Sequence, residues 1–165
     1  MGTKKIQSLL LNHLRKRPDF NILTTNYAWN LLFEADVFQI KKSGFVVEYE
    51  IKISRGDFLK DFKKHKKIFN GYGYDIVKKH DWLNSEDLLK NHFKNKYKPN
   101  EFYFVFPSGM VSLDEVPKRY GIIHILPSKQ VCIIRRPKKL HKKKYLKDND
   151  LLEVARNFTL KQCSL

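Results

Sequence analysis

The stretch EYEIKIS, residues 48–54, alternates charged and apolar side chains, which is the pattern of a β-strand. The charged row holds two carboxylates and one ammonium group: Glu48, Glu50 and Lys52. The other row is apolar. A strand with such a charged row either turns that face to water or uses it for chemistry.

The residues before this strand predict an antiparallel partner strand. Residues 31–40 are strand-like, and the turn sequence KKSG separates them from residues 45–54. A three-residue hairpin loop ending at Gly44, which supplies the positive φ, sets Lys41 opposite Phe45. This register decides which side chains of the two strands are neighbours.

The predicted register brings acidic side chains together. Asp36 lies opposite Glu50, and Glu34 lies opposite Lys52. Opposed Cβ atoms are about 4.5–5.5 Å apart, and like charges so placed repel. Mg²⁺, which is typically held by one or two carboxylates together with waters and substrate phosphate, would offset that repulsion. Glu48 lies one step closer to the turn, opposite an apolar residue, and is expected to be the least essential of the three charges in its row.

Net charge is the strongest signal of the whole chain. Lys and Arg number 33 against 17 Asp and Glu, a formal net charge of +16. A field this positive attracts polyanions. The basic residues are spread along the chain, and no apolar run approaches the ~20 residues of a membrane span. The expected partner is therefore nucleic acid and not a membrane.

The cysteine content indicates the cellular compartment, and the hydrophobic content indicates a folded domain. Cys132 and Cys163 are the two cysteines, which predicts a reducing, cytoplasmic location with no disulfide framework. The 42% hydrophobic content supports a folded core. The expected class is α/β, with a central mixed β-sheet flanked by helices.

The expected elements follow from periodicity and turn residues. Helices are expected at 4–14, 57–69 (capped by Ser54), 86–96 and 148–160, strands at 102–107, 121–126 and 130–136, and a strand or short helix at 20–30. In the 57–69 helix, Phe58 and Phe62 should pack on the sheet, and Asp61 should lie on a solvated face. We expect a core domain over 1–136, with 137–165 a basic linker and a C-terminal helix packed on or appended to it.

These motifs resemble the PD-(D/E)XK nuclease superfamily, in which an Asp on one strand and a Glu-x-Lys on the next, after a hairpin, form the active site. The stretch EADVFQIKKSGFVVEYEIKISRGDFLKDFKKHKK is similar to MmcB-like DNA-repair nucleases and related phage proteins. The shared positions are Ala35-Asp36, Glu50-Ile51-Lys52, Ser54-Arg55, Asp57-Phe58 and Asp61. The resemblance is sharp over 33–67 and looser over 100–135, and Ala35 replaces the superfamily's Pro.

The resemblance implies a restriction-endonuclease-like core and a Mg²⁺-dependent endonuclease acting on DNA, in repair, recombination or phage DNA processing. Asp36, Glu50 and the Ile51 carbonyl would ligate Mg²⁺, for which Mn²⁺ could substitute. Lys52 would orient the attacking water, and Glu34 would hold a second metal, a water or Lys52 itself. The candidate nucleic-acid contacts are Arg55, Lys60, Lys64, His65, Lys138, Lys139, Lys142, Lys143 and Lys144.

Two other functions stay open on the sequence. One is a nuclease-like fold that binds nucleic acid without cutting it. The other is a basic RNA-associated structural protein, in which Asp36 and Glu50 would lie far apart. A homodimer is compatible with the sequence, but no dimer patch indicates one.

Overall fold

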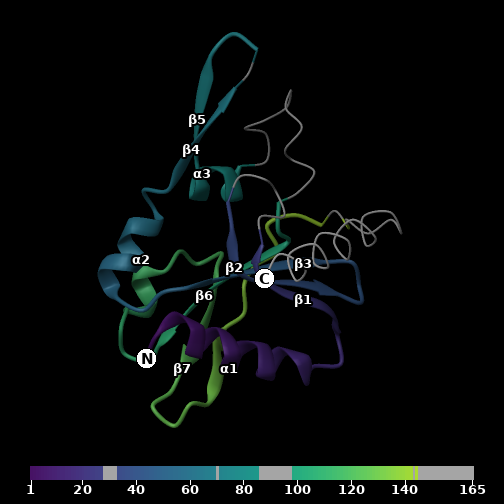
Figure 1. Cartoon of the computed structure of the whole chain (residues 1–165), viewed down its shortest axis with the longest axis vertical. Helices are drawn as coiled ribbons and strands as arrows, with labels where there is room; N and C mark the ends of the chain where they lie inside the picture. Colours follow the sequence, from purple (N-terminus) through teal and green to yellow (C-terminus); the bar gives the residue numbers. More distant parts are fainter. Residues whose placement is uncertain (28–32, 70, 86–97, 143, 145–165) are drawn as a thin grey trace, which may run out of the picture.

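The described residues form a mixed sheet with helices on both faces (Figure 1). The computed structural model describes residues 1–27, 33–69, 71–85, 98–142 and 144. Six strands are ordered β1-β2-β3-β6-β7-β8, with β3–β6 and β6–β7 parallel and the other pairs antiparallel. A separate two-stranded hairpin, β4–β5, stands apart from this sheet. The expected α/β class with a central mixed sheet is confirmed.

The elements have the following bounds. They are α1 (Thr3–Arg15), β1 (Phe20–Tyr27), β2 (Ala35–Lys41), β3 (Val46–Ile51), α2 (Arg55–Asp61), β4 (His65–Phe69), β5 (Tyr74–Lys78), α3 (Lys79–Asn84), β6 (Glu101–Pro107), the 3₁₀ turn η2 (Leu113–Glu115), β7 (Gly121–Ile125) and β8 (Val131–Arg135). The strands expected at 102–107, 121–126 and 130–136 are present, and residues 20–27 are strand.

The predicted β2–β3 hairpin register is confirmed. Val37 pairs with Tyr49, which is the register that puts Asp36 across from Glu50. The turn has the predicted chemistry: Gly44 has φ 80°, and the Lys41 N–H donates to the Phe45 carbonyl at 2.9 Å. Gly44 is needed here because a positive φ costs other residues a steric penalty.

The two faces of the sheet have different partners. Helix α1 buries Ile6, Leu10 and Leu14, one helical stripe, against the face that carries Tyr49 and Ile51. The opposite face carries an aromatic core made by α2, α3 and β6, in which Phe58, Trp82, Phe102, Phe104 and Phe106 are buried. The even-numbered residues of β3, which include the charged row, lie on this aromatic side.

The helix expected at 57–69 is wrong in its second half. Helix α2 begins after the Ser54 cap, whose Oγ accepts from the Asp57 N–H at 3.1 Å, but it ends at Asp61. The Lys63 N–H then donates to the Lys60 carbonyl at 3.0 Å, which tightens the last turn. Strand β4 follows because residues 65–69 find a full antiparallel partner in β5.

The helices expected at 86–96 and 148–160 lie outside the described residues, as does most of 137–165. The start of that last segment rests on the sheet core: Leu140 is buried, and its N–H donates to the Asn100 carbonyl at 2.8 Å. Within the described residues, no helix has the length and apolarity that a membrane crossing requires.

Candidate active site

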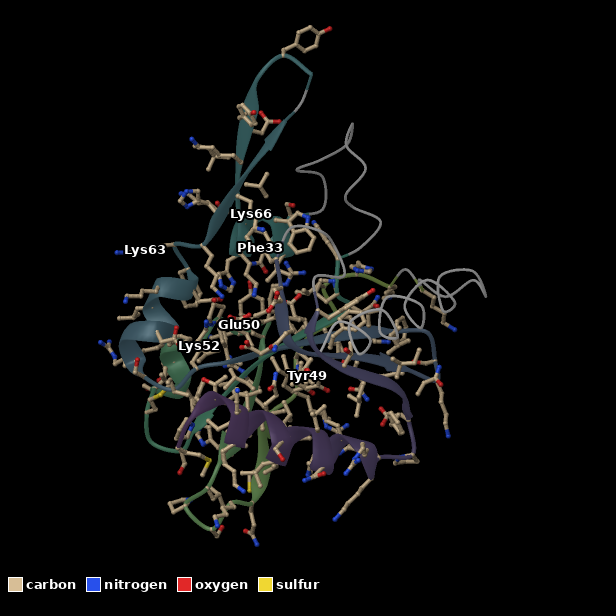
Figure 2. The ribbon with its side chains drawn as sticks, in the orientation of Figure 1. Phe33, Tyr49, Glu50, Lys52, Lys63 and Lys66 are labelled. Atoms are coloured by element: carbon tan, nitrogen blue, oxygen red, sulfur yellow. The ribbon has the colours of Figure 1, made fainter. Side chains whose placement is uncertain are left out.

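The charged row of β3 is closed to water. Glu48, Glu50 and Lys52 are 3%, 2% and 2% exposed. They lie where α2 and α3 meet the sheet, and Figure 2 labels Glu50 and Lys52 there. We call the ionisable side chains gathered at this place the charge cluster: Asp36, Glu48, Glu50, Lys52, Asp61, Lys64, Lys79 and His80.

Glu50 is the centre of the charge cluster. Its Oε1 lies 2.7 Å from the Lys52 Nζ and 2.6 Å from the Lys64 Nζ. Its Oε2 lies 2.6 Å from the Lys79 Nζ. Burial favours the protonated acid, but the Lys79 and other ammonium groups outweigh it and hold the pKa of Glu50 below its usual value.

Asp61 is the second acceptor of the charge cluster, which corrects the expectation of a solvated face. Its Oδ1 lies 2.8 Å from the Lys52 Nζ and 2.7 Å from the Lys64 Nζ, and the side chain is fully buried. The reason is helical spacing: Asp61 is three residues after Phe58, on the stripe of α2 that packs against the sheet. Burial alone would raise its pKa, but the His80 hydrogen bond and the ammonium groups, Lys79 first, hold it far below the usual value.

Glu48 is part of the charge cluster, so the expectation that it matters least is not supported by its surroundings. Its Oε1 lies 2.9 Å from the Lys79 Nζ but has no hydrogen-bond partner among the described residues. Burial raises the pKa of Glu48 although Lys79 opposes that shift. Lys79 itself is fully buried, and the neighbouring Glu48 and Glu50 carboxylates overcome its burial and raise its pKa.

Asp36 differs from the other acids of the charge cluster. Its Oδ2 accepts the Ile51 N–H at 2.7 Å, and among the described residues it forms no ion pair. Burial, followed by the Glu50 carboxylate, raises its pKa to about 6. The negative charge of the Asp36 carboxylate is therefore poorly compensated by nearby cations, and it lies next to Glu50 as the hairpin register predicts.

A chain of hydrogen bonds leads from the charge cluster to Tyr120. The His80 Nε2 lies 2.8 Å from the Asp61 Oδ2, and the His80 Nδ1 lies 2.9 Å from the Tyr120 hydroxyl. An ionised carboxylate can only accept, so the His80 Nε2–H donates to Asp61. The Tyr120 hydroxyl also accepts from the Asn84 Nδ2 at 2.8 Å.

The charge cluster holds more carboxylates than ammonium groups. Four carboxylates (Asp36, Glu48, Glu50 and Asp61) face three ammonium groups (Lys52, Lys64 and Lys79). This buried excess stands in a chain whose net charge is +16. Buried charge is costly unless it is balanced, and the raised pKa values of Asp36 and Glu48 favour their neutral forms.

Carboxylate oxygens, the ligand type that Mg²⁺ prefers, are present in the charge cluster. Asp36 and Glu50 supply two neighbouring carboxylates, which is enough for a Mg²⁺ ion that keeps several waters. Among the described residues, no group of three or more His, Cys, Asp or Glu side chains is placed to hold a metal ion. Glu50 also carries its three ammonium contacts, of which Lys64, with 43% of its side chain exposed, is the one next to solvent.

Of the other predicted site residues in the α2 region and before β2, Lys64 contacts Glu50, whereas Glu34, Arg55, Lys60 and His65 do not. Glu34 is exposed before β2, and no ion pair joins it to Lys52 in the part of the chain that is described. The Arg55 Nη2 lies 2.6 Å from the Glu115 Oε2. Lys60 and His65 are exposed. Lys64 is bound inside the charge cluster and is not a free surface cation.

The basic segment at 138–144 lies at the other end of the hairpin. The Lys139 Nζ lies 3.7 Å from the centre of the Phe45 ring, and the Lys144 Nζ lies 5.9 Å from it. Phe45 precedes β3, about 16 Å along the strand from Glu50. Lys138 and Lys142 are exposed, and Lys143 lies outside the described residues.

Sequence reasoning missed Lys79, His80 and Tyr120. Lys79 shares the spacing of the buried Trp82 and Leu83, three and four residues on, and that stripe was the available signal. Tyr120 had no local signal because its role depends on contacts across the fold. A cavity of about 180 Å³, lined by Arg17, Tyr103 and Arg136 among others, lies on the α1 side of the sheet and includes no member of the charge cluster.

Comparison with known proteins shows similarity of fold. No protein-family model and no curated protein matches the chain. A solved structure of a protein of unknown function from Silicibacter pomeroyi is similar over 99% of this chain and 88% of that one, with a TM-score of 0.62 and 14% sequence identity. At that identity the likeness shows that this chain shares the α/β fold of the Silicibacter protein.

Proposed function

We propose that this protein is a Mg²⁺-dependent nuclease that hydrolyses DNA phosphodiester bonds. The observation that carries the proposal is the placement of Asp36, poorly compensated and with a raised pKa, across the hairpin from Glu50, with Lys52 at 2.7 Å from the Glu50 carboxylate. This is the arrangement that the resemblance to PD-(D/E)XK nucleases requires of those three residues.

Stability does not account for a buried charge cluster of this kind. Replacing buried ion pairs with apolar residues is often neutral or stabilising, because each charge loses its hydration. Clusters of ionisable groups with shifted pKa values are instead typical of functional sites. The excess carboxylate of Asp36 supports the same conclusion, since it is favourable only when a cation or a proton joins it.

Each residue then has a defined task. Asp36 and Glu50 would hold the metal ion, whose chemistry is to lower the pKa of a bound water and to neutralise phosphate charge. Lys52, fixed between Glu50 and Asp61, orients the attacking water and stabilises negative charge on the phosphate. Lys64 is the ammonium group that can leave Glu50 for solvent when the metal ion enters.

The test is a cleavage assay on supercoiled, linear, branched and single-stranded DNA and on RNA, with Mg²⁺, with Mn²⁺ and with EDTA. The unmodified protein should cleave DNA only with a divalent ion, and Asp36→Asn should lower the rate at least 100-fold. Asp114→Asn, the same chemical change at an exposed position, is the matched control and should keep full activity. Full activity of Asp36→Asn would sink the proposal.

The second candidate is a nucleic-acid-binding protein that does not cut. The observation in its favour is that three ammonium groups already contact the Glu50 carboxylate. Calorimetric titration with Mg²⁺ and Mn²⁺ separates the two functions. Salt-sensitive DNA binding without divalent-ion binding would favour this candidate.

A further inference from the structure

The β4–β5 hairpin projects from the body of the protein (Figure 1). We call this hairpin, His65 to Lys78, the hairpin arm. Its five residue pairs run in unbroken antiparallel register from His65–Lys78 at the base to Phe69–Tyr74. It is a two-stranded ribbon with no third strand beside it in the described residues.

One face of the hairpin arm is exposed, basic and free of carboxylates among its described side chains. His65 pairs with Lys78, and Lys67 pairs with Ile76, so these four side chains share a face. All four are exposed, with Ile76 at 63%.

The opposite face of the hairpin arm turns toward the body. Val77 lies on that face and is buried in the aromatic core. Asp75, the one carboxylate in the hairpin arm, is also on that face. Lys66, which pairs with Val77, is on that face too and is exposed, and Asp75 is partly buried. Cations therefore lie on both faces of the ribbon, and its one carboxylate lies on the face opposite Lys67 and Lys78.

Aromatic side chains extend this solvent-facing surface toward the tip. Tyr74, on the same face as Lys67 and Ile76, is 70% exposed, and Tyr72 at the tip is 103% exposed. Tyr72 lies between Gly71, which has φ 96°, and Gly73. Cations interleaved with exposed aromatic rings are the composition of a nucleic-acid surface.

Both ends of the hairpin arm are attached to the charge cluster. Lys64 directly precedes β4 and Lys79 directly follows β5, and the Lys79 N–H donates to the Lys64 carbonyl at 2.9 Å. The Nζ atoms of both lysines lie 2.6 Å from a Glu50 carboxylate oxygen. The base of the hairpin arm is therefore joined directly to the candidate active site.

We propose that the hairpin arm binds B-form duplex DNA by lying in the major groove, with Lys67 and Lys78 on phosphates. This rests on the proposed function, because it names the substrate class of that site. The major groove of B-DNA admits a two-stranded β-ribbon, whereas the major groove of A-form RNA is too narrow for side chains to read. The positive face fits the phosphate charge on either side of the groove.

The test measures binding in EDTA, where no cleavage occurs, by fluorescence anisotropy with a labelled DNA duplex. The Lys67→Ala/Lys78→Ala double variant should raise the Kd at least tenfold and reduce the slope of log K against log salt by about two. Lys4→Ala/Lys5→Ala on α1 removes the same charge from exposed positions and should change the Kd less than twofold. Equal losses in the two double variants would overturn the proposal.

Single-stranded DNA and duplex RNA of the same sequence complete the test. The hairpin-arm variant should lose much less affinity for these ligands than for duplex DNA. A loss of the same size on all three would overturn groove binding. This result is independent of the proposed function. If the protein binds DNA through the hairpin arm but does not cleave it, the proposed nuclease activity is wrong and the proposed DNA-binding role of the hairpin arm is still supported.

Discussion

Asp36 is the residue on which ionisation and stability are most clearly linked. Burial and the Glu50 carboxylate raise its pKa from 3.8 to about 6. The folded protein then binds the proton more tightly than the unfolded chain, so stability falls as pH rises from about 4 to about 6. Above that range the whole penalty is present in the metal-free protein.

Asp36→Asn should therefore stabilise the metal-free protein at pH 8 by about 2 kcal/mol, while an amide oxygen can still accept the Ile51 N–H. Urea unfolding at pH 8 and at pH 4 measures the effect. The gain should shrink at pH 4, where the folded carboxyl is protonated and close to half of the unfolded carboxyl is protonated as well. A gain of equal size at the two pH values would contradict this account.

The same titration predicts how cleavage depends on pH. A metal ligand must lose its proton before it binds, so Mg²⁺ competes with the Asp36 proton. Cleavage at limiting Mg²⁺ should decline as pH falls through about 6, and added Mg²⁺ should move the midpoint to lower pH. If the pH midpoint of the cleavage rate did not change with Mg²⁺ concentration, the decline in rate would be due to the protonation of a group other than Asp36.

A substitution at Lys52 measures how much stability is lost when one cation is removed from the charge cluster. Lys52→Met removes the more deeply buried of the two cations that Glu50 and Asp61 share, and leaves Lys64. Removing one partner of a buried ion pair costs about 3–5 kcal/mol. Lys60→Met, on the exposed side of α2, should stay within about 0.5 kcal/mol. Matching urea midpoints for the two variants would show that the cluster tolerates the loss, which is why Asp36→Asn is the cleaner test of catalysis.

At this scale the sequence predicted the members of the charge cluster that are related by strand geometry. Asp36, Glu50 and Lys52 come together because one turn sets the register. Lys79 and Tyr120 reach the site through contacts between distant segments, and no local pattern encodes such contacts.

The strand pair β6–β7 has a close approach at Gly121 that a single substitution can test. Gly121 pairs with Tyr103, and a Cβ at residue 121 would lie 2.3 Å from a ring carbon of Tyr103. That ring is stacked on Tyr49 at 5.1 Å, so it has little room to withdraw.

Gly121→Ala should destabilise the protein by about 1–3 kcal/mol through overpacking, measured by thermal or urea unfolding. Gly56→Ala is the control, because its nearest atom would be 4.0 Å away and the position is within α2. An alanine there should add about 0.5–1 kcal/mol of stability. If both variants gained stability, the close approach at Gly121 would not constrain the sheet.

The elements also show where periodicity stops being informative. Strand β6 and the β7–β8 hairpin were predictable because their residues are apolar and bounded by turn residues. The second half of the expected 57–69 helix was not, since a lysine-rich run suits an exposed helix and an exposed strand equally well. Pairing with β5, a tertiary contact, decides that it is strand.

Over the whole molecule, carboxylates outnumber ammonium groups in the charge cluster, whereas positive charge predominates elsewhere. The buried charge cluster has more carboxylates than ammonium groups, whereas the chain as a whole carries +16. The surface must therefore hold the positive excess, and phosphate contacts should dominate binding. The affinity of the unmodified protein for duplex DNA in EDTA should fall about 10³-fold between 50 and 200 mM salt, measured by anisotropy. A loss below tenfold would contradict a phosphate-dominated interface.

The attachment of the hairpin arm at both ends has a thermodynamic consequence. Lys64 and Lys79 connect the hairpin arm, which we propose binds DNA, to the same carboxylate that would ligate Mg²⁺. If seating DNA on the ribbon draws Lys64 from Glu50, the two ligands are linked, and the factor by which DNA tightens Mg²⁺ binding must equal the factor by which Mg²⁺ tightens DNA binding. The affinity of the site for Mg²⁺ would then be low in the free protein and would rise when duplex DNA binds to the hairpin arm, so that activity would be confined to the DNA-bound protein.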